Sequence, residues 1–213
     1  MTNGTPMHRR RLYLQLQSRE ICELFERHQL PLPGRHNILN ALAAAAVADF
    51  YGMPLTEIAS ALAAATLPNK RGNLIRLAND VTVIDDSYNS NPRALAEMVE
   101  TFCATECKRR IVVAGEMLEL GPSGAGLHRD AGRRISPGKV DLLIGVHGLA
   151  REIVEGAREI GFPHDRAVFC ESADEAAESV IRVLRAGDWV LVKGSRGVRM
   201  EAVVERIRRE MGE

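Results

Sequence analysis

DWVLVKGSRGVRMEAVVERIRREM, residues 188–211, holds an apolar run, a polar loop and an amphipathic segment in that order. The apolar run ends at Lys193, and it has the length and composition of a buried strand. The later part repeats apolar residues at the spacing of one helix face: Met200, Val203, Ile207 and Met211. A buried strand that leads directly into a helix is the building unit of an α/β fold with a parallel sheet.

The same unit recurs from about residue 73 onward, where β-rich runs alternate with amphipathic stretches. The runs are VTVID (81–85), RIVVAG (110–115), VDLLIGV (140–146), AVFC (167–170) and DWVLVKG (188–194). NLIRL at 73–77 is able to pair with the first run through the turn at 78–80. We therefore predict an α/β fold, a mostly parallel Rossmann-like sheet with flanking helices, with ligand sites at the carboxyl edge of its strands.

The chain before residue 73 differs in character. Residues 1–33 are irregular and basic. Residues 35–66 are rich in alanine and predict two helices, the first ending at Gly52 and the second beginning at Pro54. We expect an N-terminal extension with a helical segment over 1–72 and a sheet domain over 73–213, and we predict that the sheet domain is the stable unit.

Charge and composition argue against several classes of protein. Lysine plus arginine equals aspartate plus glutamate at 28 each, so neither nucleic acid nor an anionic membrane is an expected partner. The longest apolar stretch, ALAAAAVADF, is too short to span a bilayer, and no signal peptide pattern is present. The four cysteines fit a reducing cytoplasm, and Cys103 with Cys107 alone does not make a metal site, so we assign no metal ligand.

Two acidic residues leave the first predicted strand in VIDDSYNSNP, residues 83–92. The alternation of a strand points Asp85 and Asp86 to opposite faces, so we expect only one of them to reach a ligand. A carboxylate in this place can accept hydrogen bonds from the two hydroxyls of a ribose. The alternative is structural, because Asn89 or Asn91 suits the cap of a helix that begins near Pro92.

The loop KGSR, residues 193–196, combines a cation with the start of a helix. Lys193 together with backbone N–H groups at a helix N-terminus would bind an anion, and the planar fork of Arg196 suits a carboxylate. A plain connection with Ser195 as a helix cap is the alternative interpretation.

Two asparagines near the start of the first helix, Asn37 and Asn40, are three residues apart and therefore neighbours on its surface. Their amides can read the edge of an adenine, or can serve as caps.

GPSGAGLH at 121–128 has the glycine spacing of a phosphate-binding P-loop, but Leu127 and His128 stand where such a loop needs lysine and serine or threonine. Without the lysine, this stretch lacks the charge that reaches the β- and γ-phosphates of a nucleotide.

Four motifs taken together resemble the Mur ligase family of peptidoglycan synthesis. They are LPLPGRHNILNALAAAAVA (30–48), VIDDSYNSNP (83–92), GEMLELG (115–121) with its following histidine, and VKGSRGVRME (192–201). The resemblance covers residues 30–211 and favours the branch that joins D-alanyl-D-alanine to a UDP-N-acetylmuramoyl-tripeptide. It implies that the chain holds the helical end of the central ATPase domain and the whole C-terminal domain, and that the reaction uses ATP and Mg²⁺ and forms an acyl phosphate.

The resemblance also implies roles for individual residues. The ATP-binding positions are Asn37 and Asn40 at the adenine, Arg71 at the phosphates and Asp86 at the ribose. The substrate-binding positions are Asn89, Lys193, Ser195 and Arg196. Glu116, Glu119 and His128 would belong to a loop around the closed active site.

Three parts of the family's machinery are not found before the GRHN stretch: a P-loop lysine, the magnesium ligands and a carbamylated lysine. We therefore expect that this chain alone is not a competent ligase. It could be part of an enzyme whose missing domains come as a separate chain. The alternatives are a stand-alone module that binds a nucleotide or a D-alanyl-peptide without catalysis, and another Mur-type amino-acid ligase.

Overall fold

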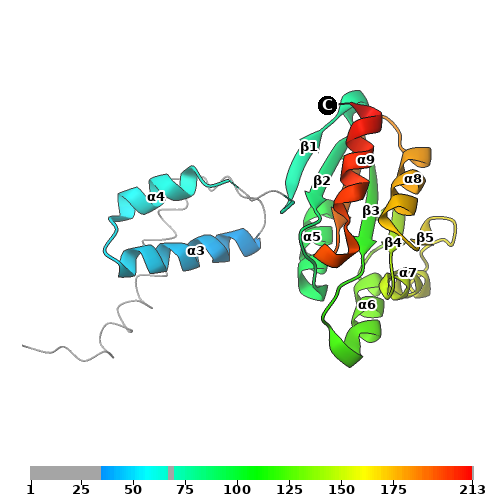
Figure 1. Cartoon of the computed structure of the whole chain (residues 1–213), viewed down its shortest axis with the longest axis horizontal. Coiled ribbons are helices and arrows are strands. Elements are labelled where there is room, and N and C mark those ends of the chain that lie inside the picture. Colours follow the sequence, from blue (N-terminus) through cyan, green and yellow to red (C-terminus); the bar gives the residue numbers. More distant parts are fainter. Residues whose placement is uncertain (1–34, 67–69, 213) are drawn as a thin grey trace, which may run out of the picture. The chain divides into compact units, whose positions relative to one another are not determined.

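The computed structural model of the chain describes residues 35–66 and 70–212. The chain divides into two compact units, Met1–Leu67 and Pro68–Glu213 (Figure 1). The predicted extension over 1–33 lies outside the described residues. Within the described ranges, no helix has the length and apolar character needed to cross a membrane.

The first unit contains helices α3 (Arg35–Phe50) and α4 (Leu55–Ala63). The backbone of Gly52 has a positive φ of 83°, which ends the first helix where the sequence predicted. Pro54 is the N-cap residue of the second helix, which begins at Leu55, one residue later than the sequence predicted. Small side chains are buried here, whereas several large apolar ones are exposed: Ile38, Leu39, Val47, Phe50, Tyr51 and Met53.

The second unit is built on a six-stranded sheet with the order β1-β2-β6-β3-β4-β5. The strands are β1 (Asn73–Arg76), β2 (Thr82–Asp86), β3 (Arg109–Gly115), β4 (Leu142–Val146), β5 (Ala167–Cys170) and β6 (Asp188–Lys193). The first two pair antiparallel, and every other neighbouring pair is parallel. All the β-rich runs of the sequence are therefore strands, and the prediction of a mostly parallel sheet is confirmed.

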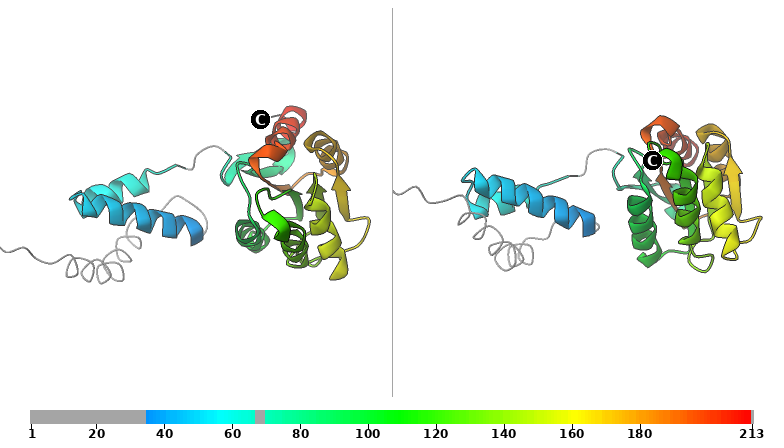
Figure 2. Two further views of the ribbon diagram at one scale, coloured as in Figure 1. Left: turned by 60° about the horizontal axis from the view of Figure 1, so that its bottom comes forward. Right: turned by 90° about the horizontal axis from the view of Figure 1, so that it is seen from below.

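Helices cover both faces of this sheet (Figure 2). One face carries α5 (Pro92–Ala104), α6 (Gly124–Arg133) and α7 (Ala150–Glu159), and the other carries α8 (Ala173–Val183) and α9 (Glu201–Met211). Strand residues alternate between the two cores: Val83 and Val192 pack with α8 and α9, whereas Ile84 and Leu191 pack with the other layer. The strands are apolar on both sides because each face is covered.

Two interior glycines let α6 and α7 approach each other closely. A Cβ atom added at Gly132 would lie 2.0 Å from the carbonyl oxygen of Ile153, and one added at Gly156 would lie 2.0 Å from that of Arg129. Any side chain at either position would push the helices apart. Glycine is unfavourable inside a helix in isolation, so its presence here is explained by this contact.

Candidate functional site

The carboxyl ends of β2, β6 and β3 meet at one edge of the sheet because β6 inserts between the other two. The loops that follow these strands contain most of the residues that the sequence singled out. Asp86 is the last residue of β2 and Asn89 lies in the loop after it. Lys193 is the last residue of β6, and Ser195 and Arg196 lie in the loop that follows. The strand order thus gathers groups that lie about 100 positions apart in the sequence.

The two acidic residues at the end of β2 have different partners. The Asp85 carboxylate accepts hydrogen bonds within its own loop, from the backbone N–H of Ser87 at 3.2 Å and from its hydroxyl at 2.5 Å. The Asp86 carboxylate accepts from the ammonium group of Lys193 at 2.6 Å. The two carboxylates lie on opposite faces of the strand, which continues the alternation of Val83 and Ile84.

Lys193 is buried, with 4% of its surface exposed. Its Nζ donates to Asp86 Oδ2 and also, at 3.0 Å, to the backbone carbonyl of Asn89. The parallel register places Lys193 directly beside Asp86. A buried ammonium group needs such a carboxylate, because an unpaired charge in the protein interior is costly. This pair therefore ties the end of β6 to the loop after β2.

Ser195 joins three loops through backbone groups. Its hydroxyl accepts from the N–H of Leu118 at 3.0 Å and donates to the carbonyl of Ser90 at 3.4 Å, and its own N–H donates to the carbonyl of Glu116 at 3.1 Å. It makes no side-chain capping bond to the short 3₁₀ turn that follows, Arg196–Val198. The hydroxyl thus cross-links the site and is not used as a helix cap.

The helix cap after β2 is Asn91. Its side-chain oxygen accepts from the N–H of Ala94 at 2.9 Å, and Pro92 is the first helical residue, as the sequence predicted. Ser90, which the sequence reasoning did not single out, is 6% exposed, and its hydroxyl has no hydrogen-bond partner among the described residues. Neighbouring asparagines gave a clear capping signal, whereas nothing in the sequence marked this serine.

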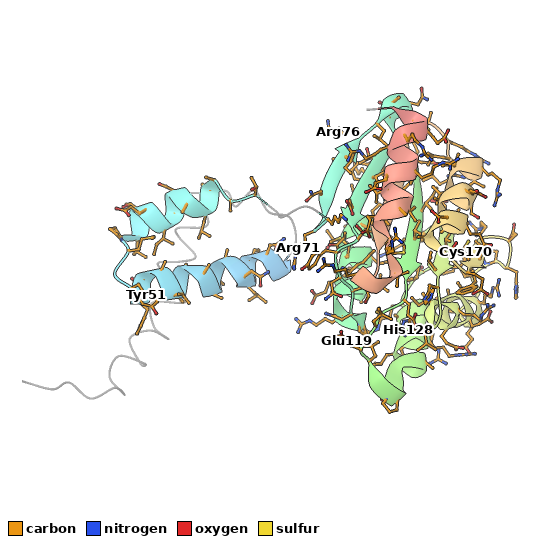
Figure 3. The ribbon with its side chains drawn as sticks, viewed as in Figure 1. Tyr51, Arg71, Arg76, Glu119, His128 and Cys170 are labelled. Carbon is orange, nitrogen blue, oxygen red and sulfur yellow. The ribbon has the colours of Figure 1, made fainter. Side chains whose placement is uncertain are left out.

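Tyr88 is a second residue that the sequence reasoning missed, and it brings two arginines together. The guanidinium carbon of Arg71 lies 4.4 Å from the centroid of the tyrosine ring, and that of Arg196 lies 5.9 Å from it. The backbone N–H of Tyr88 donates to the carbonyl of Lys70 at 3.0 Å. Arg71, which precedes β1, thereby joins the edge formed by the ends of β2 and β6 (Figure 3).

The three residues predicted for an active-site loop have separate environments. Glu116 bonds to Nδ1 of His147 at 2.8 Å and accepts from the N–H of Leu149 at 3.1 Å, so its carboxylate organises the loop after β4. Glu119 is exposed and has a positive φ of 65°. Figure 3 labels Glu119 and His128, which come from the loop after β3 and from α6 respectively.

His128 is completely buried on α6, not on a loop. Its Nε2 accepts from the N–H of Met117 at 2.8 Å, and its Nδ1 lies 2.7 Å from the carbonyl of Gly124. A ring that accepts through Nε2 carries its proton on Nδ1, which then donates to Gly124. The stretch that we interpreted as a loop up to His128 is shorter, because a 3₁₀ turn at Gly121–Ser123 leads into the helix at Gly124.

The remaining predicted residues lie on α3 in the first unit. Asn37 is buried and Asn40 is exposed, three positions apart on the same helix.

A groove of about 420 Å³ lies between α5 and α6 in the second unit, and it contains none of the predicted site residues. Apolar side chains such as Leu95, Val99 and Ile135 line it together with Arg134 and Lys139.

Comparisons with known proteins agree with this geometry. Residues 70–196 match the family described as Mur ligase, glutamate ligase domain. The chain is 30% identical over 177 residues to the UDP-N-acetylmuramoyl-tripeptide–D-alanyl-D-alanine ligase of Bacillus subtilis (strain 168), with 83% of this chain and 38% of that relative covered. It is 34% identical over 180 residues to the ligase of the same name from Escherichia coli (strain K12), covering 84% of this chain and 38% of the relative.

Among solved structures, the chain resembles a crystal structure of MurF from Acinetobacter baumannii, with a TM-score of 0.73 and 29% identity. The likeness covers 84% of this chain and 39% of that structure. This chain therefore spans less than two fifths of the length of the proteins that it matches.

Proposed function

The chain belongs to the Mur ligase family, and we propose that it is the C-terminal part of an ATP-dependent ligase that joins D-alanyl-D-alanine to a UDP-N-acetylmuramoyl-tripeptide in the cytoplasm. One observation carries the proposal. Arg71, the buried Asp86–Lys193 pair and Arg196 converge at one edge of the sheet. The names of its relatives at 30% and 34% identity support the choice of substrates.

The proposed chemistry has two steps. ATP first transfers its γ-phosphoryl group to the carboxylate of the tripeptide, which gives an acyl phosphate and ADP. The amine of D-alanyl-D-alanine then attacks the acyl phosphate, which gives an amide and releases phosphate. In this chain, the Arg71 guanidinium would hold a phosphate, because arginine presents paired N–H donors to such oxygens. Asp86 would accept from a ribose hydroxyl, and Asn37 and Asn40 would contact the adenine.

The proposed acceptor site uses the loop after β6 and the loop after β2. Arg196 is exposed, so its fork is open to the carboxylate of the dipeptide. The other three predicted residues would act mainly by holding the loops in place. The Lys193 ammonium group donates to Asp86 and to the Asn89 carbonyl, and the Ser195 hydroxyl donates to the Ser90 carbonyl, so these groups already link the loop after β6 to the loop after β2. Glu116, Glu119 and His128 stay predictions for a loop around the closed site.

Magnesium, which the family implies, does not fit the residues described here. Within the ranges 35–66 and 70–212, no group of three or more histidine, cysteine, aspartate or glutamate side chains could hold a metal ion. Asp85 and Asp86 point to opposite faces of β2 and do not form a shared site. We therefore derive no step through a metal ion from this chain.

We further propose that these 213 residues alone do not catalyse ligation, because they hold no P-loop lysine. The test is a phosphate-release assay with ATP and both substrates. The chain alone should release no substrate-dependent phosphate, and addition of the N-terminal and central domains of a homologous ligase as a second chain should restore it. Phosphate release by the purified chain alone, dependent on both substrates, would contradict the proposal.

Calorimetry with D-alanyl-D-alanine tests the acceptor site separately. Arg196→Gln should weaken binding about tenfold, the loss of one charged hydrogen-bonding partner. The matched control is Arg209→Gln on α9, another exposed arginine, which should change nothing. Equal affinity in Arg196→Gln and wild type would place the dipeptide elsewhere.

A binding module without catalysis is the second candidate, because the 213 residues hold no P-loop lysine. It predicts binding of a nucleotide or a D-alanyl-peptide but no phosphate release even with added domains. A third candidate, another Mur-type amino-acid ligase, would show release with a different amino acid in place of the dipeptide.

A further inference from the structure

Two arginines from distant parts of the chain contact one aromatic ring. Arg71 precedes β1 and Arg196 follows β6, and their guanidinium carbons lie 4.4 and 5.9 Å from the ring centroid of Tyr88. The face of a phenol ring attracts cations at such distances. The tyrosine ring therefore offsets part of the repulsion between two like charges that approach the same point.

The charges of these two guanidinium groups have no acidic partner within residues 35–66 and 70–212. In the part of the chain that the structure describes, neither has a hydrogen bond or an ion pair with another residue. Arg151 provides a contrast, since it lies 4.0 Å above the ring of Phe169 and also pairs with Glu171 at 2.8 Å. Two cations that contact the same ring create a local positive potential, which favours an anion with more than one charge.

The backbone fixes this arrangement from both sides. The N–H of Tyr88 donates to the carbonyl of Lys70, and the ammonium group of Lys70 pairs with Glu201 at 3.2 Å. Lys70 and Gly72 both have positive φ angles, of 65° and 74°, so the chain turns sharply on each side of Arg71. The arginine is thus held against the ring by its neighbours as well as by its own charge.

The loop that carries Tyr88 is itself anchored. The residue before it, Ser87, bonds to Asp85, and the residue after it, Asn89, accepts from the buried Lys193. The ring is 38% exposed, so its position is set by these neighbours and not by burial in the core. A ring on a fixed loop can orient two long side chains that would otherwise sample many rotamers.

We propose that Tyr88 is a positioning residue that holds Arg71 and Arg196 as a pair for one polyphosphate group. The inference rests on the proposed function, because it assigns the pair to the phosphate tail of the nucleotide. It adds a residue and a shared role that the motif resemblance does not contain. Arg196, which the proposed function places at the dipeptide beside the reaction centre, would also contact the phosphates together with Arg71, and both arginines depend on the Tyr88 ring. The pair has no role in bond making, and it supplies orientation and charge.

Calorimetric titration of the 213-residue chain with inorganic tripolyphosphate tests this. Wild type should bind, Tyr88→Phe should bind within about twofold, and Tyr88→Leu should bind about threefold to tenfold more weakly, since leucine keeps bulk but loses the ring face. Arg151→Gln is the control for a ring-bound arginine whose charge is already paired. D-alanyl-D-alanine is the second probe, because its carboxylate carries a single charge.

A double-mutant cycle and a spectroscopic signature separate positioning from a general structural effect. Tyr88→Leu should add little to the loss already caused by Arg71→Gln, because the ring acts through the arginine. The Nε–H proton of Arg71 should be shifted upfield by the ring in wild type and in Tyr88→Phe, and this shift should vanish in Tyr88→Leu.

Three results would overturn the inference: no binding of tripolyphosphate, equal binding in Tyr88→Leu, or full additivity of the two substitutions. Binding of the dipeptide that responds to Tyr88→Leu while tripolyphosphate binding does not would also overturn it, in favour of a carboxylate. These outcomes leave the proposed ligase function standing, since that function is judged by phosphate release with added domains and by the Arg196→Gln titration.

Discussion

The ammonium group of Lys193 lies 2.6 Å from the carboxylate of Asp86 across the parallel strands β6 and β2, and both residues are buried. Their charges compensate each other inside the protein, so each residue is costly without the other. The pair stands at the end of both strands, where the loops of the candidate site begin. Its removal should therefore disturb the stability and the geometry of the site together.

Asp86→Asn should destabilise the second unit by about 3 kcal/mol, because it leaves a buried ammonium group without a carboxylate. The double variant Asp86→Asn with Lys193→Met should recover part of that loss, because no uncompensated charge remains. Urea unfolding followed by the fluorescence of Trp189, the only tryptophan and a residue of β6, gives both values. Glu97→Gln, which breaks an exposed surface pair with Arg93, is the control and should leave the free energy of unfolding almost unchanged. A free energy of unfolding that is lower for the double variant than for Asp86→Asn alone would contradict this account.

Ser195→Ala should loosen three loops at once. The substitution leaves the N–H of Leu118 without its acceptor, at a cost of about 1–2 kcal/mol, and amide exchange at Leu118 should become faster. The comparison is Ser172→Ala, which removes the N-cap bond to Glu175 and should affect only the start of α8. Unchanged exchange at Leu118 would show that the serine does not cross-link the loops.

The sheet could be predicted from the sequence because apolar runs and helical periodicity reflect burial directly. The pairing of the first two strands was also predictable, since a short turn at 78–80 leaves few other partners. The position of β6 between β2 and β3 was not, because it depends on crossovers that no local pattern records. That position decides which residues meet Asp86.

The sequence named most of the residues of the candidate site, but it did not predict which groups surround each of them. His128 followed a glycine-rich stretch and was interpreted as part of a loop, but its ring lies inside the protein and holds Met117 and Gly124 in place. Tyr88 stood within a quoted motif, yet only the structure shows that Arg71 and Arg196 contact it. A single sequence does not predict contacts between side chains that lie far apart along the chain.

Glu201 gives a prediction about pH. Burial acts to raise the pKa of its carboxyl, but its own backbone N–H and Lys70 lower that pKa more strongly, so it lies below its ordinary value. A lowered folded-state pKa means stability that is present at neutral pH and is lost as the pH falls through that folded value. A carboxyl NMR titration should show this low pKa in wild type and a higher pKa after Lys70→Gln, in which only the hydrogen bond from the backbone N–H of Glu201 and the more distant Arg199 still lower it. An unchanged titration in Lys70→Gln would contradict the proposed anchor of the segment before Arg71.

Limited proteolysis tests the division of the chain into a stable sheet domain and a helical segment. We expect a resistant fragment that begins between residues 67 and 73 and extends to the end of α9, because the strands are buried on both faces. The helical segment should be degraded earlier, since Phe50 and Tyr51 are 66% and 82% exposed and its buried residues are mostly small. Mass spectrometry of the fragments over time identifies the boundary. Early cleavage within β3 or β6 would show that the sheet domain does not hold together without the rest of the enzyme, and a fragment that starts near residue 35 would show that the two units form a single stable body.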